Sequence, residues 1–195
     1  MDDAKKHVHI TFYTVFLTIA YTGLRRGESI GLQWKNIDFK NNTITVERTR
    51  DEKSIRSPKT KNSYRTILVD EVFIKQLETY KKWCKQVLFS EGKKLNDETY
   101  VFINEVSGEP ISSSSSLYNF NKIKKRTNLQ NITIHGLRHT HCTFLLNSGL
   151  NVKIIAKRLG NTVEMIYKIY GHVLRELETE SVALYSQSLQ SGANE

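Results

Sequence analysis

The sequence predicts an α+β fold that is mainly helical, a helical bundle with a small antiparallel β-sheet of about three strands. Apolar residues recur at helical spacing near the N-terminus, after residue 70 and through most of the chain beyond residue 112. Short runs rich in β-branched residues, Thr43–Val46 and Tyr64–Val69, occur between the first two of those regions. At 195 residues, the chain is long enough to bury a substantial core in one domain.

The first part of the chain combines helices and strands. Ile10–Tyr21 is the most apolar stretch, but threonines interrupt it and it is too short to span a membrane, so we expect a buried helix. Glu28–Trp34 is expected to form a second short helix. Thr43–Val46 and Tyr64–Val69 have the composition of strands. The basic stretch Asp51–Ser63 between them is either a loop that reaches toward phosphate or a solvated hairpin loop.

The rest of the chain is predicted to be mostly helical. Asp70 is placed to cap a long amphipathic helix with apolar positions at Val72, Phe73, Leu77, Tyr80 and Cys84. Tyr100–Ile103 is expected to be a short third strand. Further helices are expected over residues 112–126, 135–148, 151–159, 162–169 and 175–189. The glycines that mark helix ends in this region are Gly149, Gly160 and Gly171.

Charge and cysteine usage narrow the class of partner. The chain has 29 Lys and Arg against 20 Asp and Glu, a net charge of +9, so we expect an anionic partner, most commonly nucleic acid. Cys84 and Cys142 lie far apart, without metal-ligand spacing, and two cysteines do not make a disulfide framework. Reduced thiols in a cytoplasmic protein are the expected state.

Two pairs of residues are candidates for anion chemistry. His135 and Arg138 lie three residues apart at the start of a predicted helix, where free backbone N–H groups also favour an anion. The alternative is that His135 caps the helix and Arg138 forms a surface ion pair. Glu28 is placed to orient the Arg25 guanidinium, although such a pair is often only a surface ion pair.

Four ordered boxes together resemble the tyrosine recombinase, or phage integrase, family. They are Thr22–Glu28 (TGLRRGE) followed by Leu32–Asp38 (LQWKNID), Pro58–Lys61 (PKTK), His135–His139 (HGLRH), and Leu159–Asn161 (LGN) followed by Ile169–His172 (IYGH). The match covers nearly the whole chain. It implies the catalytic domain fold of that family and a DNA-cutting and rejoining enzyme acting through a 3′-phosphotyrosyl intermediate, without cofactor, ATP or divalent metal.

The resemblance also implies roles for individual residues. Arg25 and Arg138 would stabilise the phosphate in the transition state, and Tyr170 would be the nucleophile. We expect His135 to accept the phenolic proton and Lys59 to protonate the departing 5′ oxygen. The predicted catalytic residues are thus Arg25, Lys59, His135, Arg138, Asn161 and Tyr170, with Glu28, His139 and His172 in support.

Asn161 departs from the family pattern, which usually has His or Trp at this position. An amide donates a hydrogen bond but does not exchange a proton near neutral pH, so we expect a competent but slower site. Tyr167 lies one helical turn from Tyr170, and we expect it to pack rather than react. His139, His141 and Cys142 lie close together but lack metal-ligand spacing, so no metal site is expected.

Other functions remain open on the sequence alone. Val152–Thr162 is also compatible with a helix-turn-helix, and a DNA-binding regulator without catalysis would explain the charge. A metal-dependent nuclease is disfavoured, because no acidic cluster has metal-ligand spacing. The regulator would leave the arginines and the histidine motif without a role.

The resemblance implies partners as well. Double-stranded DNA at attachment or core sites is the expected substrate, bound in the cytoplasm by a tetramer that is monomeric off DNA, without a membrane. Residues 1–195 would be an isolated catalytic domain, because the family's N-terminal core-binding domain is not recognised in the sequence. Residues 175–195 would form a C-terminal helix and tail that either exchanges between protomers or packs in cis.

Overall fold

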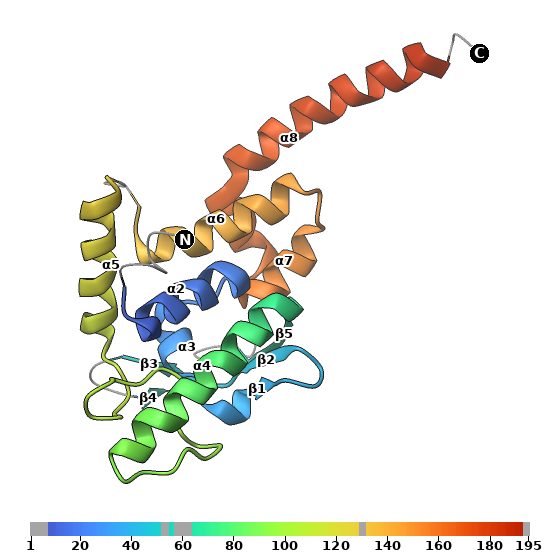
Figure 1. The fold of residues 1–195 in the computed structure, drawn as a ribbon. Helices are drawn as coiled ribbons and strands as arrows, with labels where there is room; N and C mark the ends of the chain where they lie inside the picture. The colour runs from blue at the N-terminus through green and yellow to red at the C-terminus, as the bar shows by residue number, and fades with distance from the viewer. Residues whose placement is uncertain (1–7, 52–54, 57–63, 129–131, 193–195) are drawn as a thin grey trace.

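The computed structural model in Figure 1 describes residues 8–51, 55–56, 64–128 and 132–192. Its described part is mainly helical with a small antiparallel sheet, which confirms the predicted fold class. Helix α2 (Ile10–Thr22) is central, because it packs against four other helices: α3 (Arg26–Ile30), α4 (Glu71–Ser90), α5 (Ser113–Thr127) and α6 (Ile134–Asn147).

Helix α2 is buried along most of its length, as its apolar sequence predicts. The hydroxyls of Thr14, Thr18 and Thr22 remain satisfied there, because each donates to the carbonyl four residues earlier. The helix ends at Gly23, whose φ of 69° is left-handed. A Cβ at this position would lie 2.5 Å from Leu159 Cδ2. Glycine therefore allows the end of α2 to touch the end of helix α7 (Val152–Leu159).

The bounds of the helix predicted over residues 28–34 are wrong. Helix α3 covers Arg26–Ile30, and a separate 3-10 turn, η1, covers Trp34–Asn36. The interruption has a tertiary cause, since the Leu32 carbonyl accepts a hydrogen bond from the backbone of Val101 at 2.9 Å. Pairing with a distant segment thus overrides the local helical preference.

The sheet contains the two strands predicted over Thr43–Val46 and Tyr64–Val69. Its strands are antiparallel in the order β1 (Ile37–Asp38), β2 (Thr43–Val46) and β5 (Arg65–Leu68). A separate antiparallel pair joins β3 (Thr49–Arg50) to β4 (Ile55–Arg56). In the main sheet Ile44 lies opposite Ile67, and both side chains are buried. One face of the sheet therefore joins the core.

The predicted strand Tyr100–Ile103 is wrong, and β1 takes its place as the third strand. Tyr100 and Ile103 form only isolated bridges, to Gln33 and Pro110. The segment is divided between these two partners, so it forms no continuous ladder. Its side chains also do not alternate between buried and exposed, because the three successive residues Val101, Phe102 and Ile103 are all buried. An apolar run of this length does not distinguish a strand from a buried loop.

Three predicted helices in the second half are confirmed with polar caps. Helix α5 is capped by Ser112, α6 by Thr133, and α7 (Val152–Leu159) by Asn151. Helix α7 ends at Gly160, whose φ of 61° is left-handed. The turn that follows α7 carries the candidate site.

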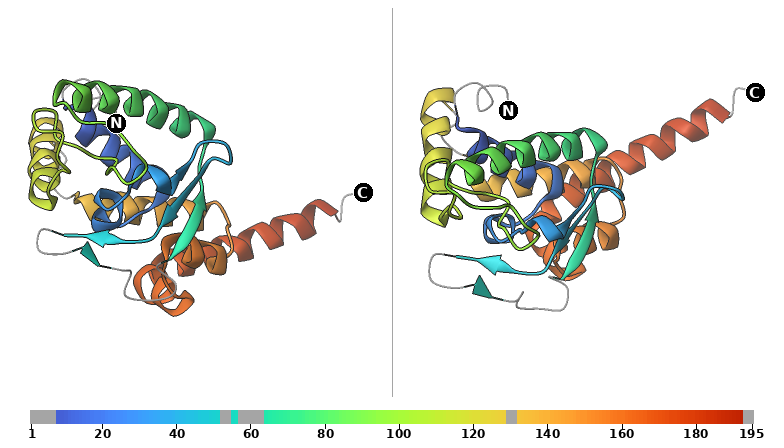
Figure 2. Two further views of the ribbon diagram at one scale, coloured as in Figure 1. Left: turned by 90° about the horizontal axis from the view of Figure 1, so that it is seen from below. Right: turned by 60° about the horizontal axis from the view of Figure 1, so that its bottom comes forward.

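The last two predicted helices are one element, α8 (Val163–Gly192). Gly171 does not end it. The helix instead has a single non-helical residue, Tyr170, with φ −113° and ψ 16°. After this kink Val173, Leu174 and Leu177 still pack against the smaller part of the core, and beyond them the helix leaves the body of the molecule, as Figures 1 and 2 show. Its exposed apolar side chains include Val182, Tyr185 and Leu189.

Two apolar clusters form the interior. The larger one combines α2, the sheet and α4, and the smaller one combines α6, α7 and the first part of α8. Leu24 belongs to the first cluster and Leu159 to the second, and each adjoins a residue of the candidate site. None of the helices in the described ranges combines the length and apolar character needed to cross a bilayer.

Candidate active site

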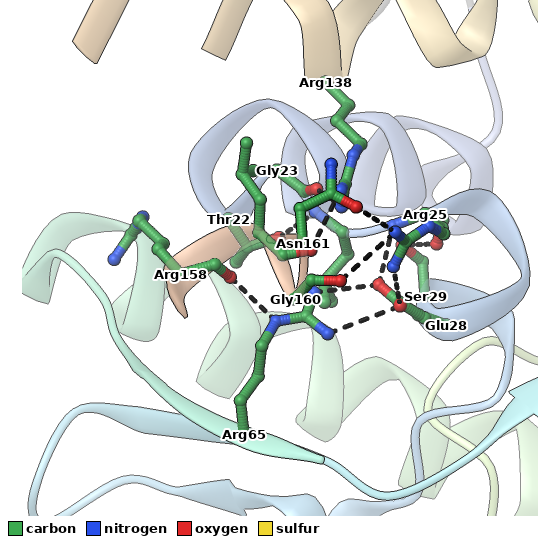
Figure 3. Close-up of polar contacts among 12 residues, drawn as sticks. Thr22, Gly23, Arg25, Glu28, Ser29, Arg65, Arg138, Arg158, Gly160 and Asn161 are labelled. Atoms are coloured by element: carbon green, nitrogen blue, oxygen red, sulfur yellow. Dashed lines mark hydrogen bonds and ion pairs between the residues drawn. The ribbon is translucent and has the colours of Figure 1, made fainter. Parts of the chain in front are cut away.

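The turn after α7 gathers arginines from three parts of the chain (Figure 3). The backbone carbonyls of residues 158–160 each accept a hydrogen bond from a different arginine, in order from Arg65 Nε at 2.7 Å, Arg138 Nη2 at 2.9 Å and Arg25 Nη2 at 3.3 Å. Carbonyls at a helix C-terminus lack intrahelical partners and carry partial negative charge. This turn therefore joins β5, α6 and the segment after α2.

Arg25 is held firmly yet remains partly open. Its backbone N–H donates to Glu28 Oε2 at 2.9 Å, and its Nη1 donates to Glu28 Oε1 at 2.8 Å. Its Nη2 donates to Asn161 Oδ1 at 2.9 Å. The predicted orientation of Arg25 by Glu28 is thus present. The Arg25 side chain is 37% exposed, so an incoming anion can approach its guanidinium.

Glu28 is a buried carboxylate shared by two arginines. Its side chain is only 4% exposed, and Arg65 Nη2 donates to Oε2 at 2.9 Å while Arg65 Nη1 donates to Oε1 at 3.3 Å. Burial by itself would raise the pKa of Glu28, but the hydrogen bonds and charges of Arg65 and then Arg25 lower it below its ordinary value. Glu28 is therefore ionised at neutral pH.

Arg138 is buried, so the alternative of a surface ion pair is wrong. Its Nη1 donates to the carbonyl of Gly23 at 2.7 Å, in addition to the bond to the turn after α7. Burial, and then the charge of Arg25, lowers the pKa of Arg138 to about 10. The guanidinium consequently remains charged at neutral pH and bridges the ends of α2 and α7.

The Tyr170 hydroxyl lies in a hydrogen bond with a histidine. It contacts His139 Nδ1 at 2.7 Å, and the tyrosine is only 4% exposed. Burial and the nearby Cys142 raise the pKa of Tyr170, while the charge of Arg138 acts in the opposite direction. Burial and then Arg138 lower the pKa of His139. At neutral pH, a protonated phenol thus faces a neutral imidazole.

The Tyr170 hydroxyl contacts His139 in this structure, whereas the sequence predicts His135 as the acceptor of its proton. His135 is exposed and lies beside His139, with ring centroids 4.7 Å apart and the planes at 89°. His139 lies one helical turn further along α6, which brings its ring to the kinked tyrosine. Burial and then the charge of His139 lower the pKa of His135.

The remaining predicted residues lie in different surroundings. Asn161 accepts from Arg25 through its side-chain oxygen, which leaves its NH₂ group as a donor. His172 is exposed on α8. Tyr167 is 54% exposed, so the expectation that its side chain packs is wrong. Lys59, with the whole Pro58–Lys61 motif, lies outside the described residues.

The structure adds three residues that the motifs did not identify: Arg65, Arg158 and His141. Arg158 Nη1 donates to the carbonyl of Leu68, and its Nε donates to His141 Nε2 at 3.1 Å. A signal for Arg65 exists in the strand pattern, because residue 65 points to the same face as the buried Ile67. An arginine at an inward strand position requires a partner.

The segment Val152–Thr162 was also compatible with a helix-turn-helix, but in the structure its turn binds arginines of the site. The carbonyls after α7 are occupied by arginines of the site, as described above. A hollow of about 460 Å³ lies beside this turn, and its polar lining includes Lys153, Lys157, Asn161 and Thr162. In the described ranges, no group of three or more His, Cys, Asp or Glu residues is arranged to hold a metal.

Comparison with known proteins identifies the family of this chain. A family model described as "Phage integrase family" matches residues 1–176. A tyrosine recombinase XerC-like protein of Caldanaerobacter subterraneus is 33% identical over 185 residues, which covers 86% of this chain and 47% of that protein. The ICEBs1 integrase of Bacillus subtilis is 34% identical over 180 residues, which covers 87% of this chain and 46% of that protein.

Solved structures share the fold. The Tn1549 transposon integrase, in complex with a circular intermediate DNA, is 25% identical with a TM-score of 0.68, over 83% of this chain and 54% of that one. The chain spans about half the length of the curated relatives it matches. A family match over most of the chain and relatives above 30% identity show that this protein belongs to the phage integrase family of tyrosine recombinases.

Proposed function

We propose that this chain is the catalytic part of a site-specific tyrosine recombinase that cuts and rejoins double-stranded DNA, for integration or excision of a mobile element. The observation that carries the proposal is the 2.7 Å hydrogen bond between Tyr170 and His139, next to the arginine cluster. A helix-turn-helix regulator would not require a buried phenol beside a neutral imidazole and two arginines.

The chemistry follows from the charges. The Tyr170 oxygen attacks phosphorus while its proton passes to His139 Nδ1, and the bond between phosphorus and the 5′ oxygen breaks. The departing oxygen takes a proton from a general acid, for which Lys59 remains our prediction. The 3′-phosphotyrosyl product keeps the energy of the cleaved bond, so a 5′-hydroxyl can reverse the step without ATP.

Arg25 and Arg138 would stabilise charge on the non-bridging oxygens. Arg25 is the more exposed of the two and would meet the phosphate directly. The Asn161 side-chain oxygen fixes Arg25, and its NH₂ group is available to donate to the same phosphate. The Asn161 amide would thus hydrogen-bond both the Arg25 guanidinium and the phosphate, without a group that titrates near neutral pH.

Tyr170 must become accessible before it attacks, because it is 4% exposed in this structure. The kink at this residue offers a point where α8 can turn. The exposed apolar side chains beyond the kink, including Val182, Tyr185 and Leu189, would contact a neighbouring copy in a DNA-bound tetramer, while the protein off DNA would be a monomer. Because its substrate is DNA, we expect the protein to act in the bacterial cytoplasm or nucleoid.

Covalent trapping tests the proposal. The wild-type chain is incubated in EDTA with a library of nicked duplexes of randomised core sequence, and the products are separated by denaturing electrophoresis. We expect a protein–DNA adduct that is absent in Tyr170→Phe and present in the matched control Tyr167→Phe. DNA binding with no adduct from any duplex would favour a regulator and contradict the proposal.

A further inference from the structure

Arg65 is a buried charge that the mechanism above does not use. It opens strand β5, only a few residues after the motif that contains Lys59, and its side chain is 3% exposed. Its guanidinium contacts both oxygens of Glu28 and the carbonyl of Arg158. A fully buried arginine with several directed bonds has its position fixed by the surrounding structure.

Glu28 connects Arg65 to the reacting centre. The same two carboxylate oxygens that accept from Arg65 also accept from Arg25, through its backbone N–H and Nη1. Without Arg65, the buried negative charge would have Arg25 as its main partner. The carboxylate would then compete with the DNA phosphate for the Arg25 guanidinium.

We propose that Arg65 is a positioning residue of the active site: it neutralises Glu28, so that the charge of Arg25 remains available to the scissile phosphate. The bond from Arg65 to the Arg158 carbonyl adds a second effect, because it holds the turn that carries Asn161. This inference rests on the proposed recombinase function, in which Arg25 binds phosphate.

The charges of the cluster agree with this assignment. Three arginines, Arg25, Arg65 and Arg138, surround one buried carboxylate, Glu28. Arg65 donates to both oxygens of that carboxylate through its guanidinium and is 3% exposed, whereas Arg25 is 37% exposed. One buried cation therefore balances the carboxylate, and the charges of the other two remain for the substrate.

The test compares Arg65→Gln and Arg65→Lys with the matched control Arg48→Gln, which changes a partly exposed arginine paired with Glu47. Single-turnover adduct formation is measured on a cleavable duplex from the trapping experiment, together with DNA affinity and thermal stability. We expect Arg65→Gln to slow cleavage about 100-fold at nearly unchanged DNA affinity, Arg65→Lys to retain an intermediate rate, and Arg48→Gln to match the wild type.

A charge-removal rescue separates positioning from folding. In the double variant Glu28→Gln/Arg65→Gln, no buried carboxylate competes for Arg25, so we expect cleavage about tenfold faster than in Arg65→Gln alone. A double variant no faster than Arg65→Gln, or an Arg65→Gln protein that cleaves at the wild-type rate, would overturn the role of Arg65. Absence of an adduct with the wild-type chain would overturn the proposed function itself, and the role of Arg65 with it.

Discussion

The site contains two hydrogen-bonded groups of side chains with different protonation behaviour. In the first, arginines and Glu28 keep fixed charges, because buried ion pairing holds the carboxylate in its ionised form. In the second, Tyr170 and His139 are neutral partners that can exchange one proton. Arg138 couples the two groups through its charge. Proton transfer and charge stabilisation are therefore assigned to separate residues.

The role of His139 predicts a pH profile. The pKa of His139 is lowered, so the imidazole is neutral and able to accept a proton at pH 7, and it gains a proton only below its ordinary range. We expect the cleavage rate of the wild type to be level near neutral pH and to fall with a midpoint below about 6.5.

Two variants distinguish the histidines. His139→Gln should slow cleavage by about 100-fold or more and remove the acidic limb of the pH profile, because the proton acceptor is lost. His135→Gln should retain the acidic limb. Single-turnover rates between pH 5 and 8 provide the measurement. An acidic limb that survives in His139→Gln and disappears in His135→Gln would reverse the assignment.

Asn161 predicts opposite effects of two substitutions. In Asn161→Asp the acceptor for Arg25 remains, but the new charge neutralises that guanidinium and repels phosphate, so cleavage should slow by about tenfold or more. Asn161→His should raise the rate, since an imidazole, unlike an amide, can exchange a proton near neutral pH. The cleavage rate of a suicide substrate measures both. An unchanged or lower rate in Asn161→His would show that the amide at this position does not slow cleavage.

At the scale of elements, the site depends on close contact between the ends of α2 and α7. Gly23→Ala should lower the free energy of unfolding by about 2 kcal/mol or more, because it adds steric overlap with Leu159 to the cost of a left-handed φ. Gly149→Ala is the matched control, with a φ of 74° and no atom within 4 Å of its Cβ, and should cost about 1 kcal/mol. Urea unfolding measures both, and equal losses would contradict the predicted contact.

His141 predicts how the stability of this junction depends on pH. Its Nδ1 lies 2.9 Å from the Ala20 carbonyl and its Nε2 accepts from Arg158, while burial lowers its pKa to about 4. The folded state thus binds fewer protons than the unfolded state between pH 4 and about 6.5. Stability is complete above that window and is lost as the pH falls through it.

The size of this loss is moderate, since part of the His141 side chain is exposed. We expect about 2 kcal/mol between pH 7 and pH 4, after allowance for screening by solvent. Urea unfolding of the wild type and of His141→Gln at several pH values provides the measurement. The variant should lose less stability than the wild type over this pH window. An equal loss would show that groups other than His141 cause the pH dependence of stability.

The elements also show which features the sequence could predict. Periodicity and caps located the helices with strong amphipathic patterns, and β-branched runs located β2 and β5. The apolar run Tyr100–Ile103 was predicted as a strand because periodicity does not reveal its two separate partners. Gly171 was predicted to end a helix, yet it continues one, since a glycine ends a helix only where the backbone turns.

For the site, the motifs identified residues but not their contacts. Arg25, Glu28 and Asn161 lie together as the motif order suggested, and the catalytic roles remain predictions. The partner of Tyr170 could not be predicted, because it depends on the kink in α8 and on the rotation of α6. Lys59 lies outside the described residues, so its role stays a prediction.

At the scale of the whole molecule, the two apolar clusters separate the site into two parts. Arg25 and Glu28 extend from the cluster that contains α2 and the sheet, while Tyr170 belongs to the cluster of α6, α7 and α8. Arg65 and Arg138 bridge these parts through the turn after α7. Movement of α8 at its kink would therefore move Tyr170, the proposed nucleophile, and leave the arginines that we propose to bind phosphate in place.

The most direct measurement of the central claim is peptide mapping of the trapped adduct. The wild-type protein–DNA complex is digested with protease and nuclease, and mass spectrometry identifies the residue that carries the remaining nucleotide. We predict a 3′-phosphotyrosyl bond on Tyr170. A nucleotide on Tyr167, or on any other side chain, would contradict the assignment of the nucleophile and the site built around it.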